Sequence, residues 1–146
     1  MPMPAPERIR TIAVVGHSHD GKTTLCEALL HVAGATPRMG STDMATSILD
    51  HEPEEQRRSM SISAAVAHLD WDGHRVNLID VPGFQDFAGE MAAALAAADA
   101  AVLVVAATGT VPVGAELAWE MIAARRLPTE RPERGVRPQM RNLGLT

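Results

Sequence analysis

The sequence predicts a three-layer α/β fold with a mostly parallel sheet, one antiparallel hairpin strand and an incomplete C-terminal side. Two observations support this prediction. Short runs of β-branched residues alternate with stretches whose apolar residues recur at helical spacing, as in strands joined by helices. A glycine-rich segment, residues 16–23, lies between the first such strand and the first such helix. The chain of 146 residues is long enough for one domain with its own core.

The first strand, residues 11–15, is a short apolar run of the kind found in buried parallel strands. The first helix follows the glycine-rich segment and should end near Gly34. The segment between them fits Gly-x-x-x-x-Gly-Lys-Ser/Thr, the pattern of a phosphate-binding loop, or P-loop. Its backbone amides and the helix N-terminus would point at one anion.

We therefore expect nucleotide phosphates to bind at this loop and at the first helical turn. The expected binding residues are Gly16, His17, Ser18, His19, Asp20, Gly21, Lys22, Thr23 and Thr24. Lys22 is the only lysine in a chain whose other basic residues are all arginine. This supports a specific role for its compact ammonium group between phosphates. The alternative is an ordinary strand-to-helix turn with an incidental lysine.

Residues 35–59 show no periodicity and are rich in acidic side chains, so we expect a long loop. Long loops in compact domains are often functional, and a solvated insertion without a role is the alternative. Two strands should follow, residues 62–71 and 74–80. The Asp72-Gly73 pair between them is a strong signal for a hairpin turn.

The second hairpin strand ends in Asp80-Val81-Pro82-Gly83. In a chain with a P-loop, an aspartate at the carboxyl end of a strand is a candidate for holding Mg²⁺ through water. Gly83 would offer its backbone amide to a terminal phosphate. Outside this context the same four residues are a common turn.

The remaining predicted elements are an alanine-rich helix over residues 86–98, a third parallel strand over 100–106 and a helix over 113–126. We expect residues 1–8 to be a flexible lead-in and 9–127 to form a partial domain. Residues 128–146 should form a basic, disordered tail that is rich in Pro and Arg and has no apolar run of strand length. Charge supports this division, because residues 1–124 carry a net −9 and residues 125–146 a net +4.

Cys26 is the only cysteine, so the chain forms no internal disulfide, and its place on the first helix indicates a buried side chain. The N-terminus lacks the apolar segment of a signal peptide, and no apolar run reaches the roughly 18 residues of a membrane span. We expect a cytoplasmic protein with neither a membrane nor a specific DNA sequence among its partners.

Residues 9–127 resemble the start of the GTP-binding domain of translational GTPases, above all elongation factor G and its bacterial paralogues. Three segments carry the resemblance in the fitting order: residues 16–25, 58–66 and 77–87. The middle one resembles the end of the first switch loop, where Arg-Gly-Ile-Thr is usual. The resemblance implies GTP and GDP as ligands, Mg²⁺ as cofactor, GTP hydrolysis in ribosomal translocation as activity, and the ribosome as partner.

The resemblance also implies roles for single residues. Lys22 would contact the β- and γ-phosphates, and Thr23 would bind Mg²⁺ through its hydroxyl. Ser61 matches the switch threonine that closes on Mg²⁺ and keeps its hydroxyl. Asp80 would hold a water of the metal, and Gly83 would sense the γ-phosphate. Such loops order around the γ-phosphate and relax after hydrolysis.

Three features depart from the family pattern. Phe84 stands where a histidine usually positions the attacking water, and Phe has no donor or acceptor. His19 replaces a frequent aspartate. The chain has neither the Asn-Lys-x-Asp motif that reads guanine nor a later Ser-Ala-Lys. The expected catalytic positions are therefore Lys22, Gly83 and Phe84, with slow turnover.

Three functions compete at this point: a GTPase, a binding-only remnant without turnover or ribosome action, and a P-loop ATPase or kinase. The segment from Asp80 to Gly83, together with Ser61, argues against the third. The basic tail has three interpretations: a weak RNA contact through its arginines, a solvated tail without a partner, or the out-of-frame end of a frameshifted or truncated gene.

Overall fold

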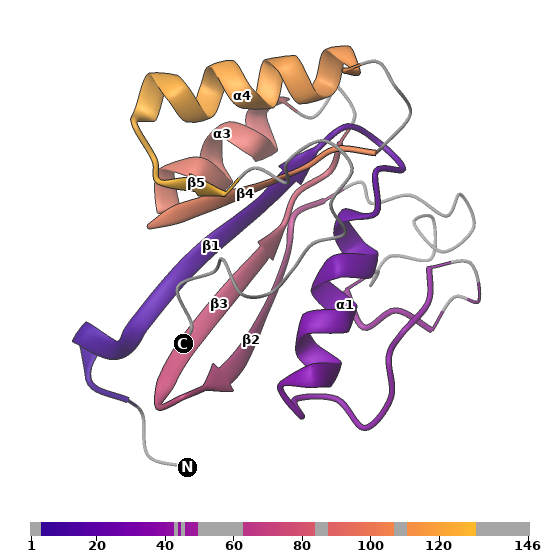
Figure 1. The fold of residues 1–146 in the computed structure, drawn as a ribbon, viewed down its shortest axis with the longest axis vertical. Coiled ribbons are helices and arrows are strands. Elements are labelled where there is room, and N and C mark those ends of the chain that lie inside the picture. The colour runs from indigo at the N-terminus through magenta and orange to yellow at the C-terminus, as the bar shows by residue number, and fades with distance from the viewer. Residues whose placement is uncertain are drawn as a thin grey trace.

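The computed structural model describes residues 4–42, 44, 46–49, 63–83, 88–106 and 111–130. The elements in chain order are η1 (Pro6–Arg8), β1 (Ile9–Gly16), α1 (Lys22–Val32), β2 (Ala65–Trp71), β3 (His74–Asp80), α3 (Ala88–Ala97), β4 (Ala100–Val104), α4 (Val113–Arg125) and β5 (Thr129–Glu130). The strands form one sheet in the order β2-β3-β1-β4-β5 (Figure 1). Neighbouring strands are parallel except in the β2–β3 hairpin. This is the predicted fold class.

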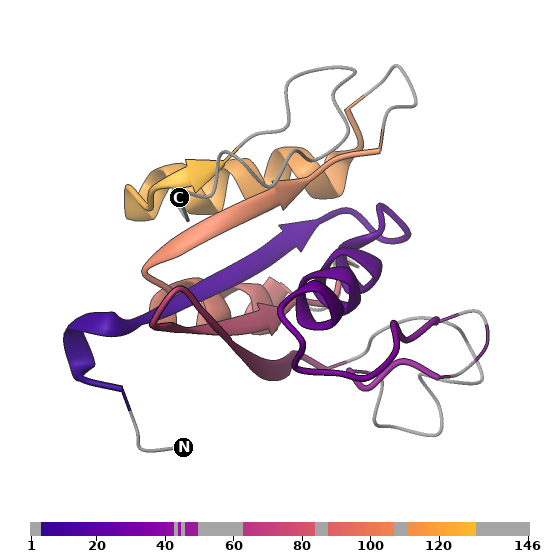
Figure 2. The same cartoon turned by 60° about the horizontal axis from the view of Figure 1, so that its bottom comes forward.

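The sheet is the middle layer, with α1 on one face and α3 and α4 on the other (Figures 1 and 2). A hydrophobic core lies on each face of the sheet, and β1 contributes to both, because successive side chains of a strand point to opposite faces. Ala13 and Val15 pack with α3 and α4, whereas Val14 packs with α1. The helices contribute mostly small or unbranched apolar residues: Cys26 and Leu30 from α1, Met91, Ala94 and Leu95 from α3, and Ala115, Ala118 and Ile122 from α4.

The β2–β3 hairpin forms at the predicted turn. Asp72 and Gly73 have φ of 46° and 74°, the two positive values that a tight two-residue hairpin turn requires. Next to the turn, the Arg75 guanidinium donates to both carboxylate oxygens of Asp70, at 2.9 and 3.1 Å. β3 then pairs with β1 so that Asp80 lies opposite Val14. The hairpin thus brings Asp80 to the end of β1 that leads into the P-loop.

The structure has a short element in each of the two end segments. The expected lead-in contains the 3-10 turn η1, in which the Arg8 amide donates to the Ala5 carbonyl at 2.8 Å. The first residues of the expected tail form β5, in which Thr129 and Glu130 pair with Ala101 and Val102. Two polar residues give no strand pattern, but backbone pairing does not depend on side-chain polarity. The tail beyond residue 130 lies outside the described residues.

Within the described ranges, no helix is both long and apolar enough to cross a membrane.

Candidate nucleotide-binding site

The P-loop runs from the last residue of β1 to the first residue of α1, as the sequence predicts. Gly16 lies so close to β4 that a side chain there would overlap the Val104 carbonyl oxygen. Gly21 precedes the helix with φ of 90°, a left-handed conformation that glycine adopts without strain. His19 also has a positive φ, 63°. The two glycines therefore fix both ends of the loop, one by close packing and one by its backbone angle.

Lys22 is buried under this loop and exposes only 7% of its surface. Its ammonium donates to the His17 carbonyl at 2.7 Å. Burial lowers the pKa of Lys22 below its ordinary value of 10.5, opposed by the nearby Asp80 and Asp20 carboxylates, which raise it. A buried ammonium that is costly to keep charged favours an anion at its side, as phosphate oxygens would provide.

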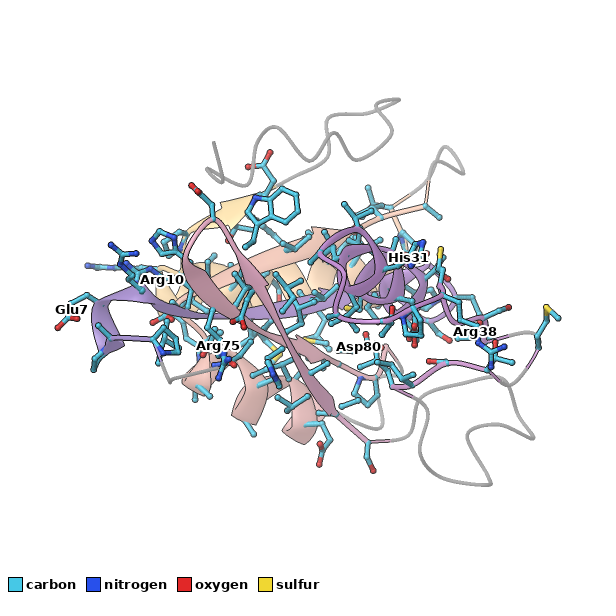
Figure 3. The ribbon with its side chains drawn as sticks, turned by 90° about the horizontal axis from the view of Figure 1, so that it is seen from below. Glu7, Arg10, His31, Arg38, Arg75 and Asp80 are labelled. Carbon is cyan, nitrogen blue, oxygen red and sulfur yellow. The ribbon has the colours of Figure 1, made fainter. Side chains whose placement is uncertain are left out.

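Thr23 and Asp80 meet at the centre of the site. The Thr23 hydroxyl donates to Oδ2 of Asp80 at 2.5 Å, and Asp80 exposes only 1% of its surface. The Val81 amide donates to the Val14 carbonyl at 3.2 Å, which carries the β1–β3 pairing past the strand end. Figure 3 shows Asp80 beside α1, far from Glu7 and Arg10 at the opposite end of the sheet. Aspartate and threonine oxygens are hard ligands of the kind that Mg²⁺ prefers.

Gly83 closes the site from the side of β3. A Cβ atom there would come within 2.5 Å of the Lys22 Nζ and of the Ser18 amide nitrogen. The segment after Asp80 therefore lies directly against the P-loop, and only a glycine fits without displacing backbone. The structure thus brings together predicted site residues from two distant parts of the sequence: Lys22 and Thr23 with Asp80 and Gly83.

Ser61 and Phe84, the predicted metal ligand and the predicted catalytic position, lie outside the described residues. In the part of the chain that the structure describes, no group of three or more His, Cys, Asp or Glu side chains could hold a metal ion. Mg²⁺ beside a nucleotide is commonly held by one or two protein ligands together with phosphate oxygens.

Sequence reasoning missed two residues next to the site, Gly114 and Glu27. A Cβ atom at Gly114, in the first turn of α4, would come 2.5 Å from Nδ1 of His17, a buried atom without a hydrogen-bond partner among the described residues. Glu27 is buried in α1 and accepts hydrogen bonds from the following loop. A glycine in one helix and an acid in the apolar stretch of another were the signals in the sequence.

The family described as "Elongation factor Tu GTP binding domain" matches residues 7–130. The chain belongs to this family. It is 42% identical over 123 residues to an elongation factor G-like protein of Mycobacterium tuberculosis, covering 84% of this chain and 17% of that protein. It is 34% identical over 121 residues to the mitochondrial ribosome-releasing factor 2 of Candida albicans, covering 83% of this chain and 15% of that protein.

A crystal structure of a protein from Thermus thermophilus is similar in fold, with a TM-score of 0.79 at 46% identity, and the match covers 83% of this chain and 18% of that one. The family resemblance that the sequence motifs indicate is thereby confirmed. The chain spans less than a fifth of the length of these relatives. The matched part is the GTP-binding domain, which contains the P-loop and Asp80.

Proposed function

We propose that this domain binds GTP and GDP with Mg²⁺ and hydrolyses GTP slowly. The observation that carries the proposal is the meeting of the Lys22 ammonium, the Thr23 hydroxyl, the Asp80 carboxylate and the Gly83 backbone at the carboxyl ends of β1 and β3. This edge is where open parallel sheets bind ligands. The family supplies the identity of the ligand, because its members are GTP-binding domains.

The described residues assign a task to each group. The Lys22 ammonium would exchange its contact with the His17 carbonyl for phosphate oxygens. The amides of the loop and of the first turn of α1 would surround the same phosphates. Thr23 and Asp80 would hold Mg²⁺, with Ser61 as a further hydroxyl, and the ion would neutralise charge that develops between the β- and γ-phosphates. The Gly83 amide would face the terminal phosphate.

Phe84 makes the chemical step the weakest part of this site. Its side chain cannot orient a water molecule, so positioning falls to backbone groups and solvent. Gln85 is adjacent, but it lies one residue away from the position that holds the histidine in the family. This observation favours a second candidate function, a domain that binds nucleotide without efficient turnover or ribosome action.

We place the protein in the cytoplasm and take the ribosome as its partner. The support is the likeness to a protein named elongation factor G-like and to a ribosome-releasing factor. We propose neither a membrane nor a specific DNA sequence as a partner. Residues 9–127 form the nucleotide-binding unit in this proposal, extended by the pairing of β5 to residue 130.

The test is calorimetric titration of the 146-residue chain with GDP and with a non-hydrolysable GTP analogue, with and without Mg²⁺. Lys22→Ala should weaken binding by about 1.5–3 kcal/mol, because it removes a charge-assisted contact to phosphate. Arg38→Ala is the matched control, since it removes one positive charge from an exposed position. Equal nucleotide affinities for wild type and Lys22→Ala would refute phosphate binding at Lys22. Nucleotide binding that does not depend on Mg²⁺ would refute the proposed role of the metal.

A further inference from the structure

Glu27 is a carboxylate buried on α1, one helical turn after Thr23, and only 1% of its surface is exposed. It accepts three hydrogen bonds from the loop that follows the helix. The Gly40 amide donates at 3.1 Å, the Ser47 hydroxyl at 2.7 Å and the Ile48 amide at 2.6 Å. A buried carboxylate is costly unless several donors satisfy it, so the loop and the carboxylate hold each other in place.

The loop is shaped to fit this carboxylate. A Cβ atom at Gly40 would come 2.5 Å from Oε2 and 2.7 Å from Cδ of Glu27, so a larger residue there would displace the carboxylate. Ser47 also accepts a hydrogen bond from the Leu49 amide at 3.1 Å. Leu49 itself exposes only 3% of its surface and belongs to the core between α1 and the sheet. Polar and apolar contacts thus hold the same stretch of loop.

We propose that Glu27 is a positioning residue that fixes residues 40–48 to α1, in the loop that precedes Ser61 in the sequence. The helix whose Thr23 would hold Mg²⁺ then also carries the anchor of the loop, because residues four apart share one helix face. The consequence for the nucleotide rests on the proposed function, in which Ser61 acts when the γ-phosphate is bound. A leucine of similar size would fill the space but would leave two amides and a hydroxyl without an acceptor.

The first measurement is hydrogen exchange of the nucleotide-free chain. In Glu27→Gln the side-chain amide offers one acceptor oxygen, so the Gly40 amide should exchange about 10- to 100-fold faster, the range that one charge-assisted hydrogen bond supports. In Glu27→Ala both the Gly40 and the Ile48 amides should exchange faster. The Leu78 amide in β3 should not change. Glu120→Gln, an exposed position on α4, is the matched control and should behave as wild type.

The second measurement is the release of fluorescent GDP and of a fluorescent non-hydrolysable GTP analogue, each with Mg²⁺. Glu27→Gln should release the GTP analogue about tenfold faster, at the low end of the same range. Its release of GDP should change little, because GDP lacks the γ-phosphate with which Ser61 acts in the proposed function. A merely structural role would instead affect the release of both nucleotides equally.

Unchanged exchange at Gly40 and Ile48 in Glu27→Ala would overturn the anchor. Should that variant not fold, the Gly40 amide in Glu27→Gln decides the question alone. Equal effects on the two nucleotides, or none, would overturn the role of the anchor in nucleotide retention. A wild-type chain that binds neither nucleotide would instead refute the proposed function, and with it the nucleotide role of Glu27, while the exchange data would still decide on the anchor.

Discussion

Phe84 follows Gly83 in the chain, at the position where translational GTPases usually carry a histidine that orients water. Replacing it by histidine should raise GTP turnover with little change in nucleotide affinity, because in the proposed function the phosphates and Mg²⁺ are bound by Lys22, Thr23 and Asp80. A well-placed acid–base group contributes about 10²–10⁴ in rate, or roughly 3–5 kcal/mol of barrier. Single-turnover hydrolysis by wild type and Phe84→His, with and without ribosomes, measures the effect. Fast wild-type turnover that is lost in Gln85→Ala would contradict the assignment.

Cys26 lies on α1 next to Glu27 and is fully buried. Burial, together with the nearby Asp80 and Glu27, raises the pKa of its thiol well above 9.0. Above pH 9 the folded chain keeps a proton that the unfolded chain releases. The contribution of this thiol to the free energy of unfolding is therefore fully present below that pH and is lost as the pH rises. From this group alone, the free energy of unfolding should fall by up to about 1.4 kcal/mol per pH unit.

The measurement for Cys26 is urea unfolding of wild type and Cys26→Ala at several pH values between about 7 and 10.5, a range that spans the ordinary pKa of a thiol. The variant should be less stable at neutral pH, because it leaves a small cavity, but its stability should fall less at alkaline pH. The lowered pKa of Lys22 acts in the opposite direction below 10.5, because the folded chain releases that proton first. Both proteins contain Lys22, but Cys26, which raises the pKa of Lys22, is present only in wild type. Parallel pH profiles would contradict the prediction.

At the scale of the elements, α3 and α4 provide a matched pair of glycines, each the second residue of its helix. Among the described residues, no atom lies within 4 Å of a Cβ atom at Gly89 of α3. A Cβ atom at Gly114 of α4 would come 2.5 Å from Nδ1 and 3.3 Å from Cα of His17. Gly89→Ala should therefore stabilise the fold by about 0.5–1 kcal/mol. Gly114→Ala should destabilise it by about 1–3 kcal/mol through overpacking and should weaken nucleotide binding by displacing the P-loop.

Chemical denaturation of the two variants, followed by titration with GDP, tests this pair. Both substitutions replace glycine by alanine at the same helix position. The difference between their free energies of unfolding therefore cancels the gain in helix propensity that they share. If both variants are stabilised and bind GDP like wild type, α4 does not support the P-loop.

The elements also show what could be predicted from the sequence. The P-loop, the hairpin and the place of Asp80 follow from local patterns, because each depends on glycines, a turn pair or a strand end that the sequence displays. The pairing of β5 depends on backbone groups of Thr129 and Glu130, whose side chains carry no strand signal. The role of Glu27 depends on a loop whose residues show no periodicity. Contacts between a helix and an irregular loop leave no pattern along the chain.

At the scale of the whole molecule, the phosphate site and the base site can be separated. The described residues bring together, around β1 and β3, the groups that we propose bind phosphates and Mg²⁺. The 146-residue chain contains no Asn-Lys-x-Asp motif, whose aspartate accepts two hydrogen bonds from guanine in the resembled family. Affinity for the triphosphate should therefore persist while recognition of the base is weak.

We expect this chain to discriminate poorly between GTP and ATP. Hydrogen bonds to a charged group contribute roughly 1.5–3 kcal/mol each, so the absence of both would remove about 10²- to 10⁴-fold of preference. Competition of GTP and ATP for a bound fluorescent GDP measures the ratio directly. Both nucleotides should lose affinity in Lys22→Ala, which shows that they occupy the same phosphate site. A preference for GTP above about 10²-fold would mean that residues of this chain other than an Asn-Lys-x-Asp motif read the guanine base.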